Sequence, residues 1–207
     1  HGLQHYKQIY QDRHRKRWKI GDWTDDTDML LCIADAVIED KGVNFLNIAR
    51  HFKTWAEGMP MGIGSHTYKV LTIGDYAEKP FEVSYMAWKM SRYQSAANGG
   101  LMRTSVVGLF PKETTACAEK ICQLTHYDPR CVGSCVIVSE LIHALVYGIE
   151  PPTRSKMKDI AKQYDVEICD YIDNAWAEPH VKPLVDYDNW GYTLSTLSVA
   201  LWSYWHA

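Results

Sequence analysis

The sequence predicts an all-α fold in a single domain. Apolar residues recur at helical spacing through most of the chain, no segment alternates like a half-buried strand, and glycine and proline fall between the periodic segments. The chain has 207 residues, of which 46% are hydrophobic and 23% charged, as expected for a globular domain with one sizeable core. No repeat, low-complexity tract or linker divides residues 1–207.

The first half of the chain predicts three helices. The first spans residues 25–40, because its apolar residues form one stripe along a helix. Gly42, just after this range, is the signal that stops it. That stripe consists of Leu30, Ile33, Ala34, Val37 and Ile38. Asn44 is a candidate N-cap for a second helix whose apolar residues extend to Phe52. Pro80 suits the first turn of a third helix, which continues through residues 81–93.

The second half of the chain predicts four helices, over residues 113–125, 129–147, 156–172 and 192–205. The second of these has Asp128 as its N-cap and Pro129 in its first turn. The last is apolar on nearly every face. A helix of that kind is normally buried all round, so we expect a partner that packs against it from outside this chain.

Charge and cysteine usage narrow the function classes. The net charge of −3 gives no global attraction to nucleic acid or membrane, and no apolar run approaches the roughly 20 residues of a membrane span. The six cysteines lack C-x-x-C spacing and no Asn-x-Ser/Thr site occurs, so we expect reduced thiols and a cytoplasmic protein. The basic run from Arg13 to Lys19 is a nucleic-acid patch or a solvated loop, and the net negative charge favours the loop.

Four carboxylates crowd residues 21–28, and they repel one another unless a cation or solvent compensates them. An EF-hand loop does not fit, because glycine and glutamate are missing from its sixth and twelfth positions. A helix N-terminus explains one or two aspartates. Thr24, Asp25 and Asp26 also supply three hard oxygen donors, which suit Mg²⁺, Mn²⁺ or Ca²⁺. From the spacing alone, the metal site and the plain helix start both remain open.

A second motif combines small residues with two glycines: Ser95, Ala96, Ala97, Asn98, Gly99, Gly100, Leu101, Met102 and Arg103. Such a loop lets a ligand approach the backbone, and its N–H groups suit phosphate, although a plain turn explains the glycines equally well. A third motif places His126 just before the helix that starts at Pro129. This histidine could contact a ligand, but a lone loop histidine is more often solvated.

Together the three motifs resemble the ADP-ribosylglycohydrolase family. The family segment Gly-x-x-Thr-Asp-Asp-Thr is matched by residues 21–27, and Asn-Gly-x-x-Met-Arg by residues 98–103. A Thr-His motif followed by Asp-Pro is matched by residues 125–126 and 128–129. The resemblance implies an orthogonal multi-helix bundle and a hydrolase that cleaves the glycosidic bond between ADP-ribose and a side chain or another acceptor. It also implies a pair of Mg²⁺ or Mn²⁺ ions.

The resemblance assigns a role to each matched residue. Thr24, Asp25 and Asp26 would be metal ligands, and Asp25 or Asp26 would be the catalytic group that accepts a proton from the attacking water. The loop of residues 95–99 would hold the phosphates and the distal ribose, and His126 would also touch ADP-ribose. Met102 and Arg103 would support this loop from behind.

The chain departs from the family pattern at both ends. Nothing before Gly21 resembles the family's glycine-rich first helix with its acidic residue, and the Gly-Asp-Thr-Asp-Thr segment that completes the metal shell does not occur. We therefore expect a domain that is either truncated at both ends or completed by another chain, which would supply the missing ligands. The expected partner is ADP-ribose or an ADP-ribosylated protein. The alternative is a relative without catalysis, either an ADP-ribose-binding protein or a crystallin-like structural one.

Overall fold

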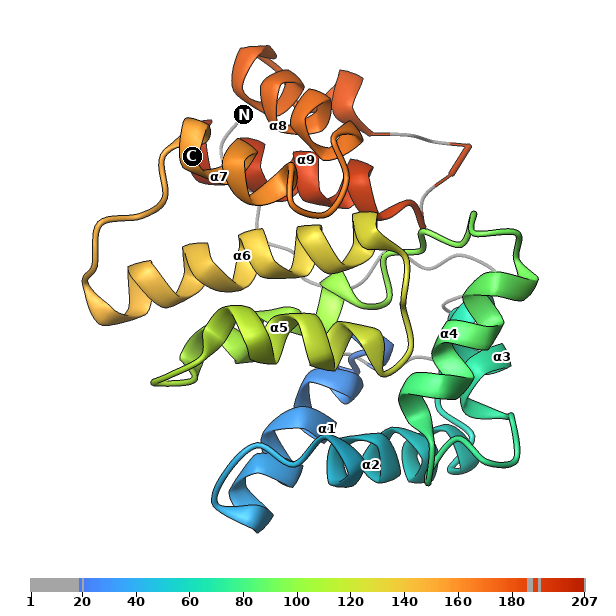
Figure 1. Ribbon diagram of the computed structural model, residues 1–207. Coiled ribbons are helices and arrows are strands. Elements are labelled where there is room, and N and C mark those ends of the chain that lie inside the picture. Colours follow the sequence, from blue (N-terminus) through green and yellow to red (C-terminus); the bar gives the residue numbers. More distant parts are fainter. Residues whose placement is uncertain (1–18, 20, 186–187, 190, 207) are drawn as a thin grey trace.

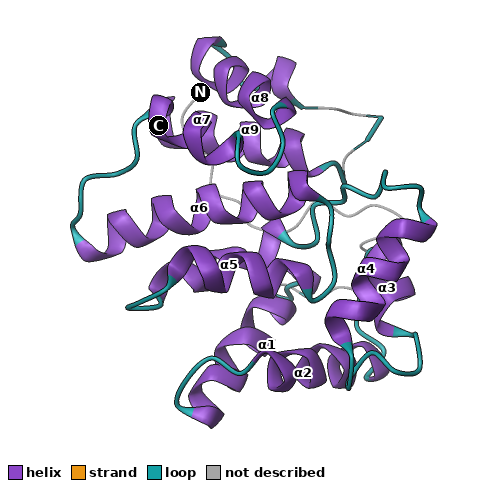
Figure 2. Cartoon of the chain, in the orientation of Figure 1, coloured by secondary structure: helices purple, strands orange, loops and turns teal. Residues whose placement is uncertain are grey.

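The computed structural model describes residue 19 and residues 21–185, 188–189 and 191–206 (Figure 1). The regular structure in these ranges is helical throughout (Figure 2), and their one β-type pairing is an isolated bridge between Ala97 and Tyr192. The all-α prediction is confirmed. Except for Lys19, the basic run from Arg13 to Lys19 lies outside the described residues, so its two interpretations remain predictions.

Four helices come from the first part of the chain: α1 (Asp25–Asp40), α2 (Phe45–Glu57), α3 (Ser65–Leu71) and α4 (Pro80–Met90). Asn44 caps α2 as predicted, since its Oδ1 accepts from the backbone N–H groups of Leu46 at 3.2 Å and Asn47 at 3.3 Å. The sequence pattern does not predict α3, because seven residues are too few to show a helical repeat. In Figure 1, α1 and α2 form the lower tier of the molecule, and α3 and α4 stand beside it.

The middle tier of Figure 1 consists of η2 (Leu101–Leu109), α5 (Thr114–Gln123) and α6 (Pro129–Tyr147). The α6 helix has its predicted bounds, and Asp128 Oδ1 accepts from the N–H of Arg130 at 3.0 Å. The 3₁₀ helix η2 begins directly after the glycine loop, which is the part of the second predicted motif from Ser95 to Gly100. The sequence predicts neither its length nor its type.

The upper tier consists of α7 (Arg154–Ala161), α8 (Glu167–Ala177) and α9 (Thr193–His206), with η3 (Lys182–Leu184) before α9. The single helix predicted over residues 156–172 is wrong. The chain turns after α7, where Asp165 Oδ1 accepts from the N–H of Glu167 at 2.8 Å and starts a new helix. A local cap of this kind competes with helix continuation and leaves no trace in the apolar pattern.

Helix α6 lies at the centre of the fold, in contact with η2, α5, α7, α8 and α9. By length and composition it is long and apolar enough to cross a membrane, and it is the one such helix in the described part of the chain. Its packing among the other helices accounts for that composition. The α9 helix buries Leu194, Leu197 and Leu201 completely, whereas Ala200 and Tyr204 are exposed. Burial of α9 on every side is therefore not observed.

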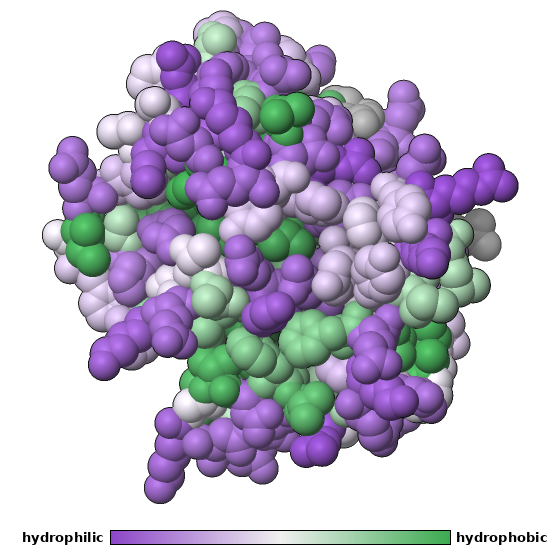
Figure 3. Space-filling view, viewed as in Figure 1, coloured by the Kyte–Doolittle hydropathy of each residue, from purple (hydrophilic) through white to green (hydrophobic). Residues whose placement is uncertain are grey.

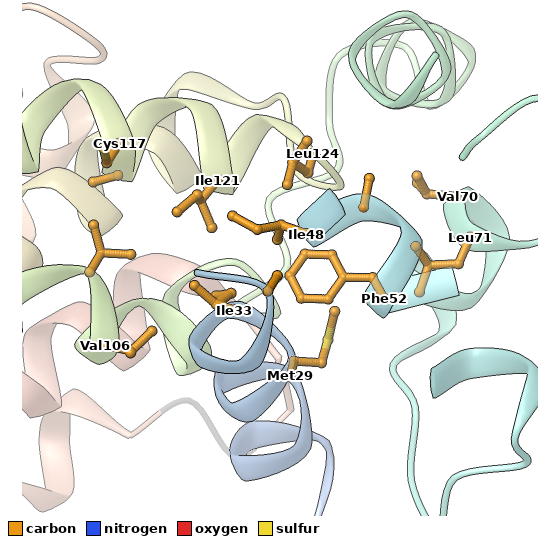
Figure 4. Packing of buried hydrophobic residues seen from close by; sticks show 14 of the residues in the cluster. Met29, Ile33, Ile48, Phe52, Val70, Leu71, Val106, Cys117, Ile121 and Leu124 are labelled. Atoms are coloured by element: carbon orange, nitrogen blue, oxygen red, sulfur yellow. The ribbon is translucent and has the colours of Figure 1, made fainter. Parts of the chain in front are cut away.

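Two groups of buried side chains form the core. In the first, Met29, Ile33, Phe52 and Ile121 from α1, α2 and α5 converge between the lower and middle tiers (Figure 4). The second joins α6 to the upper tier. The outer face seen in Figure 3 is mainly hydrophilic, with apolar side chains gathered in the lower half of that view. The molecule thus packs as three tiers around two apolar layers.

The guanidinium of Arg103 lies in the first layer and is completely buried. It donates from Nη2 to Thr125 Oγ1 at 2.6 Å and to the carbonyl of Ile121 at 3.1 Å. Its Cζ lies 4.4 Å from the centre of the Phe52 ring, a cation–π contact. Arg103 therefore joins α2 and α5 to η2, and its expected role in supporting the loop of residues 95–99 stays a prediction.

We expect Arg103→Lys to lower the free energy of unfolding by about 2–4 kcal/mol, measured by urea denaturation. A lysine keeps the charge but cannot serve both oxygen acceptors while stacking on Phe52. Arg50 on the exposed face of α2 provides the matched control, and Arg50→Lys should change the stability by less than about 0.5 kcal/mol. Equal stability of Arg103→Lys and the wild type would contradict this account of the core.

Candidate active site

The carboxylate cluster lies at the N-terminus of α1. Thr24 is the N-cap residue, and its hydroxyl donates to Asp26 Oδ2 at 3.0 Å. Asp28 has a different role, because its two oxygens accept from the indole N–H groups of Trp23 at 2.8 Å and Trp55 at 2.9 Å. The Asp28 carboxylate is thereby occupied in holding α2 against α1. The oxygens of Thr24, Asp25 and Asp26 are those that a cation could use.

Burial and the neighbouring charge of Asp26 raise the pKa of Asp25, while the backbone N–H of Gly64 acts in the opposite direction. No ion pair between described residues involves Asp25 or Asp26. A bound divalent cation would compensate both charges, so the donor set fits a hard cation such as Mg²⁺. Among the described residues, no three His, Cys, Asp or Glu side chains gather around one point.

A cavity of about 580 Å³ lies between α3, α4 and the predicted glycine loop. Two predicted ligand-binding residues, Ser95 and Ala97, line it. Its other lining residues come from α3, α4 and the turns that follow them: Ser65, His66, Lys69, Ile73, Ala87, Met90 and Ser91. Sequence analysis misses all seven, because α3 is short and nothing in the pattern indicates that α3 and α4 face the loop.

The cavity and the carboxylate cluster share one short segment. The backbone N–H of Gly64 acts to lower the pKa of Asp25, a Cβ added at nearby Gly62 would lie 3.5 Å from Asp25 Oδ1, and Ser65 and His66, the next two residues after Gly64, line the cavity. Two residues span at most about 7 Å of chain, so the edge of the cavity lies close to Asp25. The structure thus brings the first two predicted motifs together through a helix that the sequence does not predict.

His66 and Ser95 form a close pair in the cavity wall. Ser95 Oγ lies 2.6 Å from His66 Nδ1, and His66 Nε2 lies 2.9 Å from the carbonyl oxygen of Thr125. Burial lowers the pKa of His66, which favours the neutral imidazole. Thr125 belongs to the third predicted motif, so this histidine connects the second motif to the third.

His126 does not line the cavity. It is completely buried, its Nδ1 lies 2.7 Å from Thr125 Oγ1, and its ring centre lies 4.7 Å from that of His66. The interpretation of His126 as a solvated loop residue is therefore wrong. Its ring fills the space beside Gly99, where a Cβ atom would lie 2.8 Å from His126 Cε1 and 2.9 Å from Thr67 Oγ1. Packing thus requires the glycine, whether or not a ligand approaches the loop.

The start of α9 holds the glycine loop in place. The carbonyl of Ala96 accepts from the N–H of Thr193 at 3.0 Å, and the N–H of Asn98 donates to the carbonyl of Gly191 at 2.7 Å. The Ala96 side chain is buried, so it supports the loop without lining the cavity. Ser95 and Ala97 are the two loop residues whose side chains are available to a ligand in the cavity.

Asp128 and Arg130 connect the same region to α4 and α9. Asp128 is almost completely buried, accepts from the indole N–H of Trp88 at 3.0 Å and pairs with the guanidinium of Arg130 at 2.9 Å. The carboxylate of Asp128 raises the pKa of Arg130 further above its usual value. The guanidinium also lies 5.9 Å from the ring of Tyr192. This network fixes α4 and the start of α9 on both sides of the loop.

Comparison with known proteins gives a family and two curated relatives. The sequence model of the family described as ADP-ribosylglycohydrolase matches residues 1–207. The ADP-ribosylarginine hydrolase Tri1 of Pseudomonas putida (strain GB-1) is 22% identical over 206 residues, which cover 92% of this chain and 52% of the relative. The protein of the same name from Serratia proteamaculans (strain 568) is 23% identical over 200 residues, with the same coverage. The chain spans about half the length of these curated relatives.

The packing around Gly99 predicts that Gly99→Ala lowers the free energy of unfolding by about 1–3 kcal/mol, because the buried His126 ring has little room to move. Thermal or urea denaturation measures this. Gly42→Ala is the control, since no atom lies within 4 Å of the Cβ it would add, and it should be neutral within about 0.5 kcal/mol. A Gly99→Ala variant as stable as the control would show that the loop can shift away from His126.

Proposed function

The chain belongs to the ADP-ribosylglycohydrolase family, and from this premise we propose that it is a metal-dependent hydrolase acting on the glycosidic bond between ADP-ribose and a modified side chain. The observation that supports this best is the segment of residues 62–66, which passes close to the Asp25 carboxylate at Gly62 and lines the cavity at Ser65 and His66. A ligand in the cavity would have one end near Thr24, Asp25 and Asp26. Binding and cleavage can therefore use neighbouring parts of the fold.

The cavity suits a nucleotide-sized ligand. Its volume falls within the roughly 300–1,000 Å³ range of small-molecule sites, and such sites combine an apolar lining with a few polar groups. Ile73, Ala87 and Met90 supply the apolar wall, where a flat base could pack. Lys69 supplies an ammonium group that would attract a diphosphate. These features support ADP-ribose as the ligand.

In this proposal Thr24, Asp25 and Asp26 hold Mg²⁺ or Mn²⁺ from one side. A cation bound there would supply Lewis-acid chemistry, orienting ribose hydroxyls and lowering the pKa of a nearby water. Asp25 or Asp26 accepts the proton of the water that attacks the anomeric carbon. The bond from Thr24 to Asp26 orients one of the two carboxylates for that task.

We propose arginine as the modified side chain. Both curated relatives are named ADP-ribosylarginine hydrolases, which supports this choice. The decisive experiment incubates the full chain with an ADP-ribosylarginine peptide and Mg²⁺ and measures released ADP-ribose by chromatography.

A second candidate function is ADP-ribose binding without cleavage. It is favoured by one observation, the absence among the described residues of a third acidic or histidine ligand near the carboxylate cluster. The same peptide assay separates the two functions. Release of ADP-ribose supports the hydrolase, whereas binding of ADP-ribose without release supports the binding protein.

The metal proposal predicts that Mg²⁺ or Mn²⁺ raises the melting temperature of the chain. A ligand at 100 times its Kd stabilises the native state by about 2.7 kcal/mol. The double variant Asp25→Asn with Asp26→Asn should lose this response. The control is Asp35→Asn with Asp40→Asn, which changes the charge of the same helix by the same amount at exposed positions. If neither Mg²⁺ nor Mn²⁺ changes the melting temperature of the wild type, the proposal is contradicted.

The cavity proposal predicts that Ala87→Phe weakens ADP-ribose binding at least about tenfold, because a phenyl ring would occupy part of the cavity. Isothermal titration calorimetry measures the change. Ala200→Phe adds the same ring on the exposed face of α9, away from the cavity lining, and should leave the affinity unchanged. Equal affinities of the two variants would place ADP-ribose elsewhere on the molecule.

A further inference from the structure

The hydrogen bonds of His66 fix which of its nitrogens carries the proton. A carbonyl oxygen can only accept, so His66 Nε2, 2.9 Å from the Thr125 carbonyl, must be the donor. A neutral imidazole has one N–H, which leaves Nδ1 as an acceptor. Ser95 Oγ, 2.6 Å from Nδ1, therefore donates its hydrogen to His66.

The carbonyl that fixes His66 is itself held in position. Thr125 Oγ1 accepts from the buried guanidinium of Arg103 at 2.6 Å and lies 2.7 Å from His126 Nδ1. The Thr125 side chain is thus held from two sides, by Arg103 and by His126. The position of the Thr125 carbonyl, and with it the orientation of His66, depends on the core of the fold.

A serine hydroxyl that has given its only hydrogen to a histidine presents lone pairs alone to the cavity. It can accept from a ligand hydroxyl or amine, and it repels an anionic phosphate oxygen. We propose that His66 is a positioning residue that makes Ser95 an obligate acceptor, so that the ADP-ribose group bound at Ser95 is a ribose hydroxyl and not a phosphate oxygen. This inference rests on the proposed function, since it assumes that ADP-ribose occupies the cavity.

The polar groups of the cavity wall then bind different parts of ADP-ribose. The resemblance to the family assigns phosphates and distal ribose to the whole loop of residues 95–99. The bond to His66 separates these two roles, because it leaves Ser95 able to accept a hydrogen bond from an uncharged ribose hydroxyl but not to donate one to a phosphate. The diphosphate is then left to groups that carry positive charge or N–H donors, of which Lys69 is the cation in the cavity lining.

The first test needs no ligand. Nitrogen-15 NMR of the histidine rings should show His66 as a neutral ring protonated at Nε2, with the Nδ1 resonance of a hydrogen-bond acceptor. Ser95→Ala should move the Nδ1 resonance and leave Nε2 protonated. A ring protonated at Nδ1 would overturn the inference directly.

The second test uses pyrophosphate as the probe for phosphate binding, in competition with ADP-ribose. Ser95→Ala should weaken ADP-ribose binding about three- to tenfold, the effect of one neutral hydrogen bond, and leave pyrophosphate competition unchanged. His66→Phe keeps a ring beside His126 but frees the Ser95 hydroxyl, so pyrophosphate should compete about tenfold better. Adding Ser95→Ala to His66→Phe should remove that gain.

The control is His51→Phe on α2, outside the cavity lining, which should leave pyrophosphate competition as in the wild type. Weaker pyrophosphate competition in Ser95→Ala alone would mean that Ser95 donates to phosphate, and it would refute this inference while leaving the proposed function intact. Absence of ADP-ribose binding to the wild type would refute the proposed function instead. The NMR measurement requires neither ADP-ribose nor the His66→Phe variant. It therefore tests the protonation of His66 even where His66→Phe fails to fold.

Discussion

The buried guanidinium of Arg103 is the interaction on which the rest of the structure depends. A cation in the core carries a large desolvation cost, and here neutral acceptors and the face of Phe52 offset it. Burial lowers the pKa of Arg103, but a guanidinium stays charged, so its donors need acceptors in fixed directions. The helices α2, α5 and η2 must therefore meet at one geometry, since a shift of any of them would leave a buried charge without its contacts.

That constraint reaches the cavity through Thr125. Arg103 fixes the Thr125 hydroxyl, and the backbone of Thr125 fixes His66. The ring of His126, which lies 4.7 Å from that of His66, and the hydroxyl of Thr67 occupy the space beside Gly99, which is why Gly99 cannot carry a side chain without a shift. A series of short contacts thus connects the fully buried Arg103 to the partly buried His66 and Ser95 in the cavity wall.

Apolar spacing and cap residues in the sequence predict many of the helices of this fold. The bounds of α1 follow from its apolar spacing, whereas the starts of α2 and α6 also follow from Asn44 and Asp128, whose side chains form the predicted cap bonds. The unpredicted features depend on tertiary contacts instead. Apolar periodicity cannot reveal α3, which has only seven residues, nor the turn at residues 162–166 that divides the predicted 156–172 helix into α7 and α8. It also cannot show that His66, 29 positions before Ser95, lies in the same cavity wall.

The arrangement of charge along the site gives the proposed chemistry its direction. The carboxylates stand at the N-terminus of α1, while the cavity wall holds the imidazole of His66 and the ammonium group of Lys69. In the proposed function Lys69 attracts the anionic diphosphate, so the phosphates of the ligand would lie on the Lys69 side of the cavity. The other end of the ligand would then lie toward Asp25 and Asp26, where the proposed cation would bind. One segment, residues 64–66, separates these two regions by a few ångströms of chain, and this closeness lets an uncharged ribose bridge them.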